Sequence, residues 1–273
     1  MSSSPGETSG QAASLSLTGI GVRFGGLIAL EDVSMDVPAG RIVGIIGPNG
    51  AGKTTLFNVV CGFVKPTAGT MLLNGQHLQP RPDRLASMGI ARTLQGVGLF
   101  NGLTVLENVM AGGTHTAKTG FSSALFGLPR GDKDERRLRD EAMALMEELG
   151  VAAQAGLPPA VLPYALRKRV SLARALASKP RLLMLDEPAG GLSSDDIDEL
   201  VGLVGGLTNR STGACTVMLV EHHMDFVMRV CNQIVVLDFG RVIATGTPQE
   251  VRENPAVAEA YLGAEVEPET VTP

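Results

Sequence analysis

The stretch "GPNGAGKTT", from Gly47 to Thr55, constrains most strongly what this chain can fold into. It follows the apolar run "RIVGII" and precedes "LFNVVCGF", so that a strand, a glycine-rich loop and a helix succeed one another. This order is typical of a loop that wraps the phosphates of a nucleotide. The glycines let the backbone approach the phosphates, and successive N–H groups at a helix N-terminus form an anion-binding nest. The sequence therefore predicts an α/β domain that binds a nucleotide.

Two side chains of this loop have predicted functions in binding the phosphates and the metal ion. We expect the Lys53 ammonium to reach the β- and γ-phosphates and the Thr54 hydroxyl to bind Mg²⁺. The residues that we expect to contact ATP within the loop are Gly47, Pro48, Asn49, Gly50, Ala51, Gly52, Lys53, Thr54 and Thr55.

A second motif, "LLMLDEP", indicates hydrolysis of the nucleotide. Leu182 to Leu185 predict a buried strand whose end presents Asp186 to the metal ion and Glu187 to an attacking water. Read alone, the two acids could simply be a solvated pair at a strand end. Beside a phosphate loop they favour an ATPase, because a small-molecule kinase would need no glutamate at this place.

Hydrophobic patterns predict the other elements. "EDVSMDVP" alternates as a half-buried strand does, while "RIVGIIG", "TVMLVEH" and "QIVVLDFG" are runs typical of strands buried on both faces. Asn74 and Gly75 predict a hairpin turn. Helix starts are predicted at two capping boxes, Thr104 with Glu107 and Thr247 with Glu250, and a long amphipathic helix is predicted to end at Gly150.

Composition limits the functional classes. The net charge of −5 argues against a broad nucleic-acid footprint, and no apolar run approaches the roughly 18 residues of a membrane span. The 3 cysteines lack metal-ligand spacing and fit a reducing compartment. The polar start of the chain does not read as a signal peptide. We therefore expect a soluble chain that works at a membrane only through partners.

Four stretches together resemble the ATP-binding subunits of ABC transporters: "GPNGAGKTT", "RTLQGVGLF", "LARALASKPRLLMLDEP" and "VEHHMDFV". The resemblance covers about Leu15 to Gly263. With "DFGRVIATGTPQEV" and "NPAVAEAYLG", the chain looks most similar to subunits of branched-chain amino-acid (Liv-type) importers.

The resemblance implies an α/β fold: a P-loop NTPase (RecA-like) core with an N-terminal antiparallel β part and an inserted helical subdomain. It implies the following division of the chain: tails at 1–14 and 264–273, an ATP-binding core at 15–97 and 167–263, and a helical subdomain at 98–166.

The resemblance also implies roles for single residues. Phe24 falls where an aromatic ring stacks on adenine, although a core phenylalanine is the alternative. Gln95 falls at the Q-loop, where it would sense Mg²⁺ and the γ-phosphate, and His222 falls at the switch histidine, where it would orient the water with Glu187. Ser193 ends "GGLS", which matches the D-loop.

The stretch "LPYAL" aligns with the family signature, which caps ATP bound to the opposite subunit. Leu162 and Tyr164 fit one of its forms, whereas Pro163, Ala165 and Leu166 replace the usual Ser, Gly and Gln. We interpret the following "RKR" (167–169) as a solvated helix face, with contact to a phosphate as the alternative.

These features predict the ATP-hydrolysing subunit of an importer for branched-chain or related hydrophobic amino acids. The expected ligands are ATP and Mg²⁺. The expected partners are two membrane-spanning permease subunits, a second and different ATPase subunit and, indirectly, an extracytoplasmic solute-binding protein, with no nucleic acid. The expected place is the cytoplasmic face of the cell membrane. The alternatives are a non-transport ABC-type ATPase and a nucleotide-gated assembly module with little hydrolysis.

Overall fold

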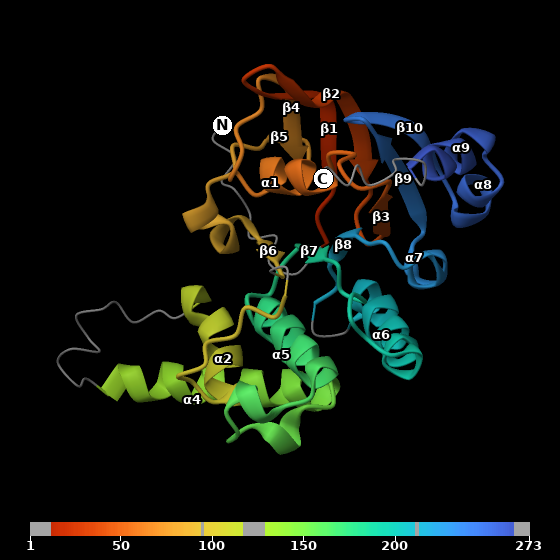
Figure 1. Cartoon of the computed structure of the whole chain (residues 1–273). Coiled ribbons are helices and arrows are strands. Elements are labelled where there is room, and N and C mark those ends of the chain that lie inside the picture. Colours follow the sequence, from red (N-terminus) through yellow and green to blue (C-terminus); the bar gives the residue numbers. More distant parts are fainter. Residues whose placement is uncertain (1–11, 94–95, 117–128, 211–212, 265–273) are drawn as a thin grey trace, which may run out of the picture.

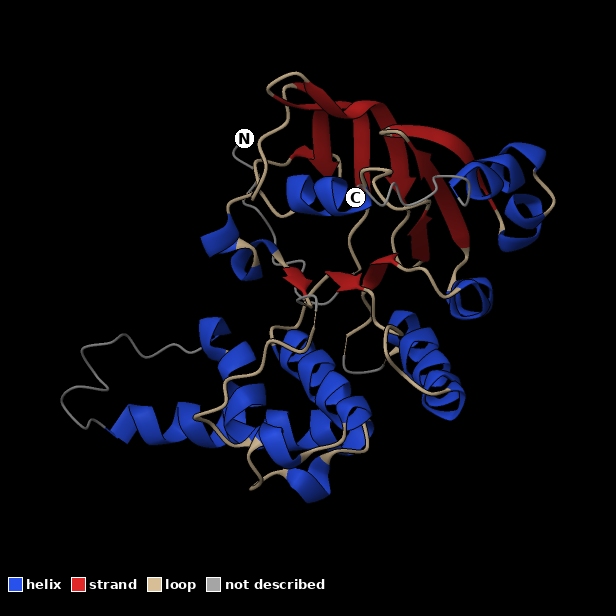
Figure 2. Cartoon of the chain, in the orientation of Figure 1, coloured by secondary structure: helices blue, strands red, loops and turns tan. Residues whose placement is uncertain are grey.

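The computed structural model describes residues 12–93, 96–116, 129–210 and 213–264. Two β-sheets form its upper part and a group of helices its lower part (Figures 1 and 2). The larger sheet has six strands in the order β10-β9-β3-β8-β7-β6. In chain order these strands are β3 (Ile42–Ile46), β6 (Ile90–Arg92), β7 (Leu182–Asp186), β8 (Thr216–Val220), β9 (Gln233–Asp238) and β10 (Arg241–Gly246). All neighbours are parallel except β9 and β10.

The central strands are covered on both faces, as their continuous apolar runs predict. Every residue of β3, β7 and β8 is buried. Because successive side chains of a strand point to opposite faces, the strands contribute alternately to two hydrophobic cores. Leu182 and Met184 belong to one core, whereas Leu183 and Leu185 belong to the other.

The smaller sheet is antiparallel and has the order β2-β1-β4-β5. It consists of β1 (Leu15–Phe24), β2 (Leu27–Val37), β4 (Ala68–Leu73) and β5 (Gln76–His77). Helix α1 (Lys53–Val60) lies between this sheet and the larger one, and its buried side chains share one core with both (Figure 1). The predicted hairpin turn is confirmed, since Leu73 pairs with Gln76 and both Asn74 and Gly75 have positive φ.

The other face of the larger sheet is covered by helices. Helices α2 (Val105–Gly112), α4 (Pro129–Glu148) and α5 (Tyr164–Ala177) form the group at the lower left of Figure 1. Helices α6 (Ser194–Gly206), α7 (Met224–Val230), α8 (Pro248–Arg252) and α9 (Pro255–Ala264) follow the later strands. Short 3₁₀ turns lie at Pro82–Arg84, Ala86–Met88, Thr114–Thr116, Ala152–Gln154, Pro159–Val161 and Leu207–Asn209.

Helix starts follow the predicted capping chemistry. Thr104 and Glu107 form a complete capping box on α2, and Thr247 and Glu250 form another on α8. Gly150, with φ 69°, follows the end of α4 as predicted. The division of the chain into a core and a helical subdomain with boundaries at 97 and 167 stays a prediction, because α5 itself runs across the second boundary.

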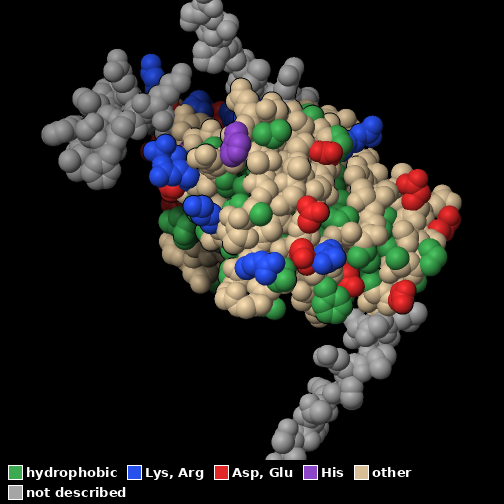
Figure 3. Space-filling view, turned by 90° about the horizontal axis from the view of Figure 1, so that it is seen from above, with side chains coloured by type: hydrophobic (Ala, Val, Ile, Leu, Met, Phe, Trp, Pro, Cys, Tyr) green, Lys and Arg blue, Asp and Glu red, His purple; other side chains and the backbone are tan. Residues whose placement is uncertain are grey.

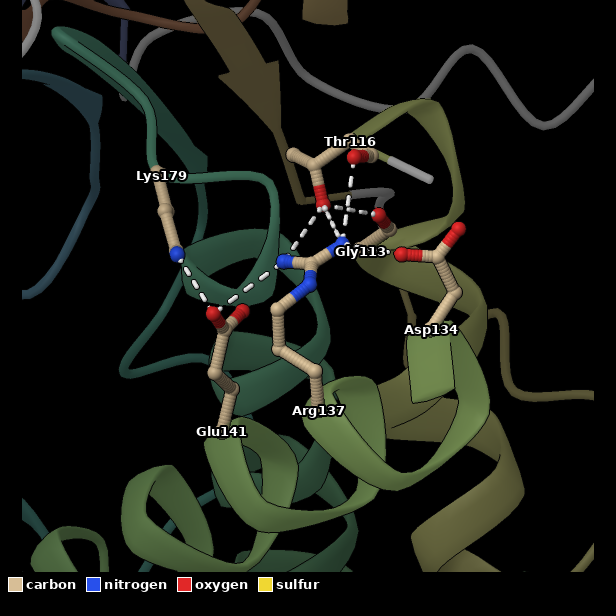
Figure 4. A network of polar contacts seen from close by, with 6 residues as sticks. All are labelled: Gly113, Thr116, Asp134, Arg137, Glu141 and Lys179. Atoms are coloured by element: carbon tan, nitrogen blue, oxygen red, sulfur yellow. Dashed lines mark hydrogen bonds and ion pairs between the residues drawn. The ribbon is translucent and has the colours of Figure 1, made fainter. Parts of the chain in front are cut away.

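A network of hydrogen bonds and ion pairs connects α4 to Thr116 and Lys179 (Figure 4). Arg137 donates to the carbonyl oxygen of Thr116 at 3.1 Å and pairs with Glu141 at 3.1 Å. Glu141 in turn accepts from Lys179, in the loop between α5 and β7, at 2.8 Å. The network therefore joins the end of the α2 segment, α4 and the approach to β7.

The face above the smaller sheet carries charges of both signs. In Figure 3, most Lys and Arg side chains lie on the left of this face, and most Asp and Glu side chains lie in its centre and on its right. Among the described residues, no helix is long and apolar enough to span a bilayer.

Candidate functional site: a phosphate loop beside an Asp-Glu strand end

The backbone of the loop between β3 and α1 has a shape that requires glycine. Gly47, Gly50 and Gly52 have φ of 147°, 80° and 99°. A Cβ on Gly47 would lie 2.0 Å from the carbonyl oxygen of Leu237, and one on Gly52 would lie 2.7 Å from that of Ala29. Backbone carbonyl oxygens of β9 and β2 therefore lie so close to the loop that they leave no room for a side chain at Gly47 or Gly52.

The start of α1 is suited to an anion. Within the described part of the chain, no side chain caps this helix, and its first turn has no acidic residue. The first N–H groups of a helix lack intrahelical partners and carry partial positive charge. Pro48, Asn49 and Ala51 lie in the loop, and Thr54 and Thr55 lie in the first turn of α1.

Lys53 lies folded along the loop. Its ammonium donates to the carbonyl oxygens of Gly47 and Pro48, both at 2.7 Å. Burial lowers the pKa of Lys53, and the negative charge of Glu187 opposes this shift. Arg92 bonds both Asn58 of α1 and Asp186 of β7, so the helix that follows the phosphate loop and the end of β7 are neighbours, as the two motifs together predict.

Asp186 ends β7 and is buried. Its Oδ2 lies 2.6 Å from Nη2 of Arg92, at the end of β6, and its backbone N–H donates to the Thr93 hydroxyl. Arg92 also donates to Oδ1 of Asn58 in α1 at 2.7 Å. No sequence pattern indicates this role for Arg92, because a single arginine at a strand end matches no motif spacing.

Glu187 and His222 are brought together by the parallel pairing of β7 and β8. Asp186 lies opposite Val220, so the residues that follow the two strands emerge at the same edge of the sheet. Oε1 of Glu187 lies 3.2 Å from Nε2 of His222, and both side chains are partly open to solvent. Glu187 has φ 48°, a left-handed conformation that is uncommon for a residue with a side chain.

The segment "RKR" is not a solvated face, and that interpretation is wrong. Lys168 donates to the backbone carbonyl oxygen of Glu187 at 2.6 Å. Arg169 forms an ion pair with Glu199, and the guanidinium of Arg167 lies over the Tyr164 ring. No sequence motif indicates a role for Glu221 either. Its side chain is buried, with 1% exposed, and accepts hydrogen bonds from the backbone N–H groups of Ala189 and His222.

Helix α5 begins inside the signature-like stretch. Pro163 is its N-cap residue and offers no side-chain cap, while Leu162 is buried. Ala165 and Leu166 are half-buried in the first turn. Tyr164 lies against Gly191, where a Cβ would come within 3.1 Å of the tyrosine ring. This stretch therefore contacts the "GGLS" segment of the same chain, in which Ser193 is the N-cap of α6.

Two predicted residues lie at the margins of the site. Phe24 ends β1 and is 50% exposed, so the alternative of a core phenylalanine is wrong, and its stacking on adenine stays a prediction. Gln95 lies outside the described residues. His223 is the N-cap residue of α7, without a side-chain cap.

The oxygen ligands at the site suit Mg²⁺. This ion prefers hydroxyl, carboxylate and phosphate oxygens. The Thr54 hydroxyl stands at the start of α1, and Arg92 links α1 to the Asp186 carboxylate. The residues present therefore fit the ion, with the Arg92–Asp186 pair as a competing partner for the carboxylate.

Known proteins resemble this chain over most of its length. A family described as "ABC transporter" matches residues 30–190, and one described as "Branched-chain amino acid ATP-binding cassette transporter" matches residues 241–267. The high-affinity branched-chain amino acid transport ATP-binding protein LivG of Escherichia coli K12 is 41% identical over 91% of this chain and 97% of its own length. BraF of Pseudomonas aeruginosa, which has the same description, is 40% identical over the same shares.

Solved structures show the same fold. A crystal structure of an ATP-binding cassette of an ABC transporter in its ADP conformation superposes with a TM-score of 0.77 at 29% identity. The match covers 92% of this chain and 99% of that one. A nucleotide-free ATP-binding cassette from an ABC transporter also gives a TM-score of 0.77, at 28% identity, over 91% and 98% of the two chains.

Proposed function

Since the chain belongs to the ATP-binding family of ABC transporters, we propose that it powers the import of branched-chain or related hydrophobic amino acids by hydrolysing ATP. The main structural support for ATP hydrolysis is the 3.2 Å contact between Glu187 and His222 at the edge of the sheet beside the phosphate loop. The substrate class is supported by the 41% identity to LivG and by the match of residues 241–267.

ATP would lie with its phosphates along the loop and at the start of α1. The backbone N–H groups and Lys53 would bind the β- and γ-phosphates, because Lys53 already reaches along the loop to its carbonyl oxygens. Phe24, exposed at the end of β1, would stack on adenine.

Glu187 would accept the proton of the attacking water. Its carboxylate is partly exposed, and its contact with His222 leaves the second oxygen available to a water. His222 would donate from the same side toward the γ-phosphate and hold the carboxylate in position. Bound Mg²⁺ would neutralise phosphate charge, with Thr54, Asp186 and Gln95 as the residues that hold it directly or through water.

The chain would act as one part of a membrane complex. We infer two permease subunits, a second ATPase and an extracytoplasmic solute-binding protein, with this subunit bound at the cytoplasmic face of the membrane. The net charge of −5 speaks against nucleic acid as a partner.

The signature-like stretch makes the two ATP sites unequal in our proposal. Pro163 has neither a hydroxyl nor an N–H to offer a phosphate, and Ala165 adds a methyl group where close backbone approach is needed. The free start of α5 still favours an anion. The ATP bound to the partner subunit is covered by the "LPYAL" stretch of this chain and should be hydrolysed slowly. The ATP bound to this chain is covered by the signature of the partner, which we expect to be closer to the usual form, and should be hydrolysed at a normal rate.

Reconstitution tests the proposed function. The chain is co-expressed with the membrane subunits that co-purify with it, and the complex is placed in vesicles. We expect uptake of leucine, isoleucine or valine that requires ATP on the side of this subunit and the solute-binding protein on the other. If no membrane protein co-purifies, or if ATP hydrolysis proceeds without any uptake of hydrophobic amino acids, the proposal is refuted.

A further inference from the structure

Glu221 is a buried acid that the proposed reaction does not use. It lies between β8 and α7 and is 1% exposed. Its two carboxylate oxygens accept three backbone hydrogen bonds. Oε1 accepts from the N–H of Ala189 at 2.6 Å, and Oε2 accepts from those of His222 at 2.6 Å and His223 at 3.0 Å.

These bonds join the two segments that carry the reacting side chains. Ala189 follows Glu187 by two residues, and His222 follows Glu221 directly. One carboxylate thus fixes the backbone on both sides of the 3.2 Å contact between Glu187 and His222. We propose that Glu221 is a positioning residue that holds Glu187 and His222 at the separation needed for hydrolysis. The inference deepens the proposed function and rests on it.

The conformation of Glu187 explains why such support is needed. Its φ of 48° is unfavourable for a residue with a Cβ, and such strain persists only where the surroundings hold it. Its backbone N–H donates to the Val220 carbonyl oxygen at 2.9 Å, and its own carbonyl accepts from Lys168 at 2.6 Å. Glu221 adds the third attachment, on the turn that follows.

Only a carboxylate of this length satisfies the three donors. A glutamine keeps one acceptor oxygen, and its NH₂ group would face an N–H donor. A buried N–H without an acceptor is costly, so the segments would shift. Near this site, burial lowers the pKa of Lys168, and the negative charges of Glu221, Glu187 and Asp186 oppose that shift.

The test is Glu221→Gln in the assembled transporter, with hydrolysis at the partner's site silenced. Glu250→Gln is the matched control, because Glu250 also accepts a backbone N–H, that of Thr247, but caps α8 away from the site. We expect kcat to fall roughly ten- to hundredfold in the Glu221 variant, since a displacement of about 1 Å near the chemistry can cost about 100-fold. The KM for ATP should stay within about twofold of the wild type, because the phosphate loop is untouched.

A double variant separates positioning from a general structural role. If Glu221 acts by positioning the Glu187–His222 pair, adding Glu221→Gln to Glu187→Gln should lower kcat much less than Glu221→Gln lowers it in the wild type, because the two losses are not additive. Multiplying losses, a parallel rise in KM, or a kcat equal to that of the Glu250 control would overturn the inference.

Two further outcomes are distinguishable. If Glu221→Gln does not fold, Glu221→Asp tests the same point, since it keeps the charge but cannot span both segments; an unchanged kcat in that variant overturns the inference. If the wild-type complex itself hydrolyses no ATP, the proposed function fails, which is a different result from a hydrolysing wild type with an unaffected Glu221 variant.

Discussion

The guanidinium of Arg92 joins three elements at the edge of the site. From the end of β6 it binds Asn58 of α1 and Asp186 of β7, and it lies over the Phe57 ring with 5.6 Å to the ring centroid. The side chains of Arg92 and Asp186 are 12% and 4% exposed, so water screens this pair only weakly. Removing one partner of a buried ion pair leaves an uncompensated charge.

We therefore expect Arg92→Met to lower the free energy of unfolding by about 3 kcal/mol. Adding Asp186→Asn should recover part of this loss, because the unpaired carboxylate is then gone. Urea unfolding of the isolated chain measures both. A loss of less than about 1 kcal/mol in the single variant, within the range of an exposed pair, would contradict a buried and structural role.

At the residue scale, the sequence predicts motifs well and isolated charges poorly. The phosphate loop, the Asp-Glu strand end and His222 each have a spacing or a neighbouring run that indicates where they meet. Arg92, Lys168 and Glu221 have none, because their partners are backbone groups or residues more than 15 positions away. Only the fold brings these partners together.

At the element scale, α4 depends on the network around Glu141 (Figure 4). Burial raises the pKa of Glu141, but its hydrogen bonds and ion pairs with Lys179 and Arg137 outweigh that effect, and the net shift is downward. A carboxylate with a lowered pKa stabilises the folded state above its unfolded pKa of about 4.3, and this contribution is lost as the pH falls through the folded value.

Glu141→Gln should thus lower the free energy of unfolding by less than about 1 kcal/mol at pH 7, since the pair is partly exposed. The difference from the wild type should shrink as the pH falls below about 4.3. Urea unfolding at a series of pH values measures it, with Glu147→Gln, an exposed residue of the same helix, as the control. A difference that persists at low pH would show that the charge of Glu141 is not what matters.

Helices, strands and turns with a clear local sequence pattern could be predicted, but the elements that they pack or pair with could not. Capping boxes, the Asn-Gly turn and the doubly buried strands follow from local chemistry. The sheet order β10-β9-β3-β8-β7-β6 does not, because all strands adjacent in this sheet except β9 and β10 are distant in the chain. The contact between Tyr164 and Gly191 was likewise not predictable, since it joins the starts of two segments that no spacing relates.

At the scale of the whole molecule, "LPYAL" predicts an asymmetric pair of ATP sites. Pro163→Ser together with Ala165→Gly should raise hydrolysis at the partner's site by roughly ten- to 150-fold, the value of one hydrogen bond to a charged group. The measurement is made in the assembled transporter with this chain's own site silenced. Pro248→Ser, at the first position of α8, is the control. An unchanged rate would mean that both substitutions are tolerated and the asymmetry is absent.

In the proposed function, Glu187 is the residue that drives hydrolysis at this chain's phosphate loop. The direct measurement is ATP turnover by the assembled transporter that carries Glu187→Gln, with the partner's site silenced and Glu253→Gln, an exposed residue beyond α8, as the control. We predict that ATP still binds, because Lys53 and the loop N–H groups remain, and that turnover falls by about 10²–10⁴-fold. Turnover near that of the control variant would contradict the role of Glu187 in hydrolysis.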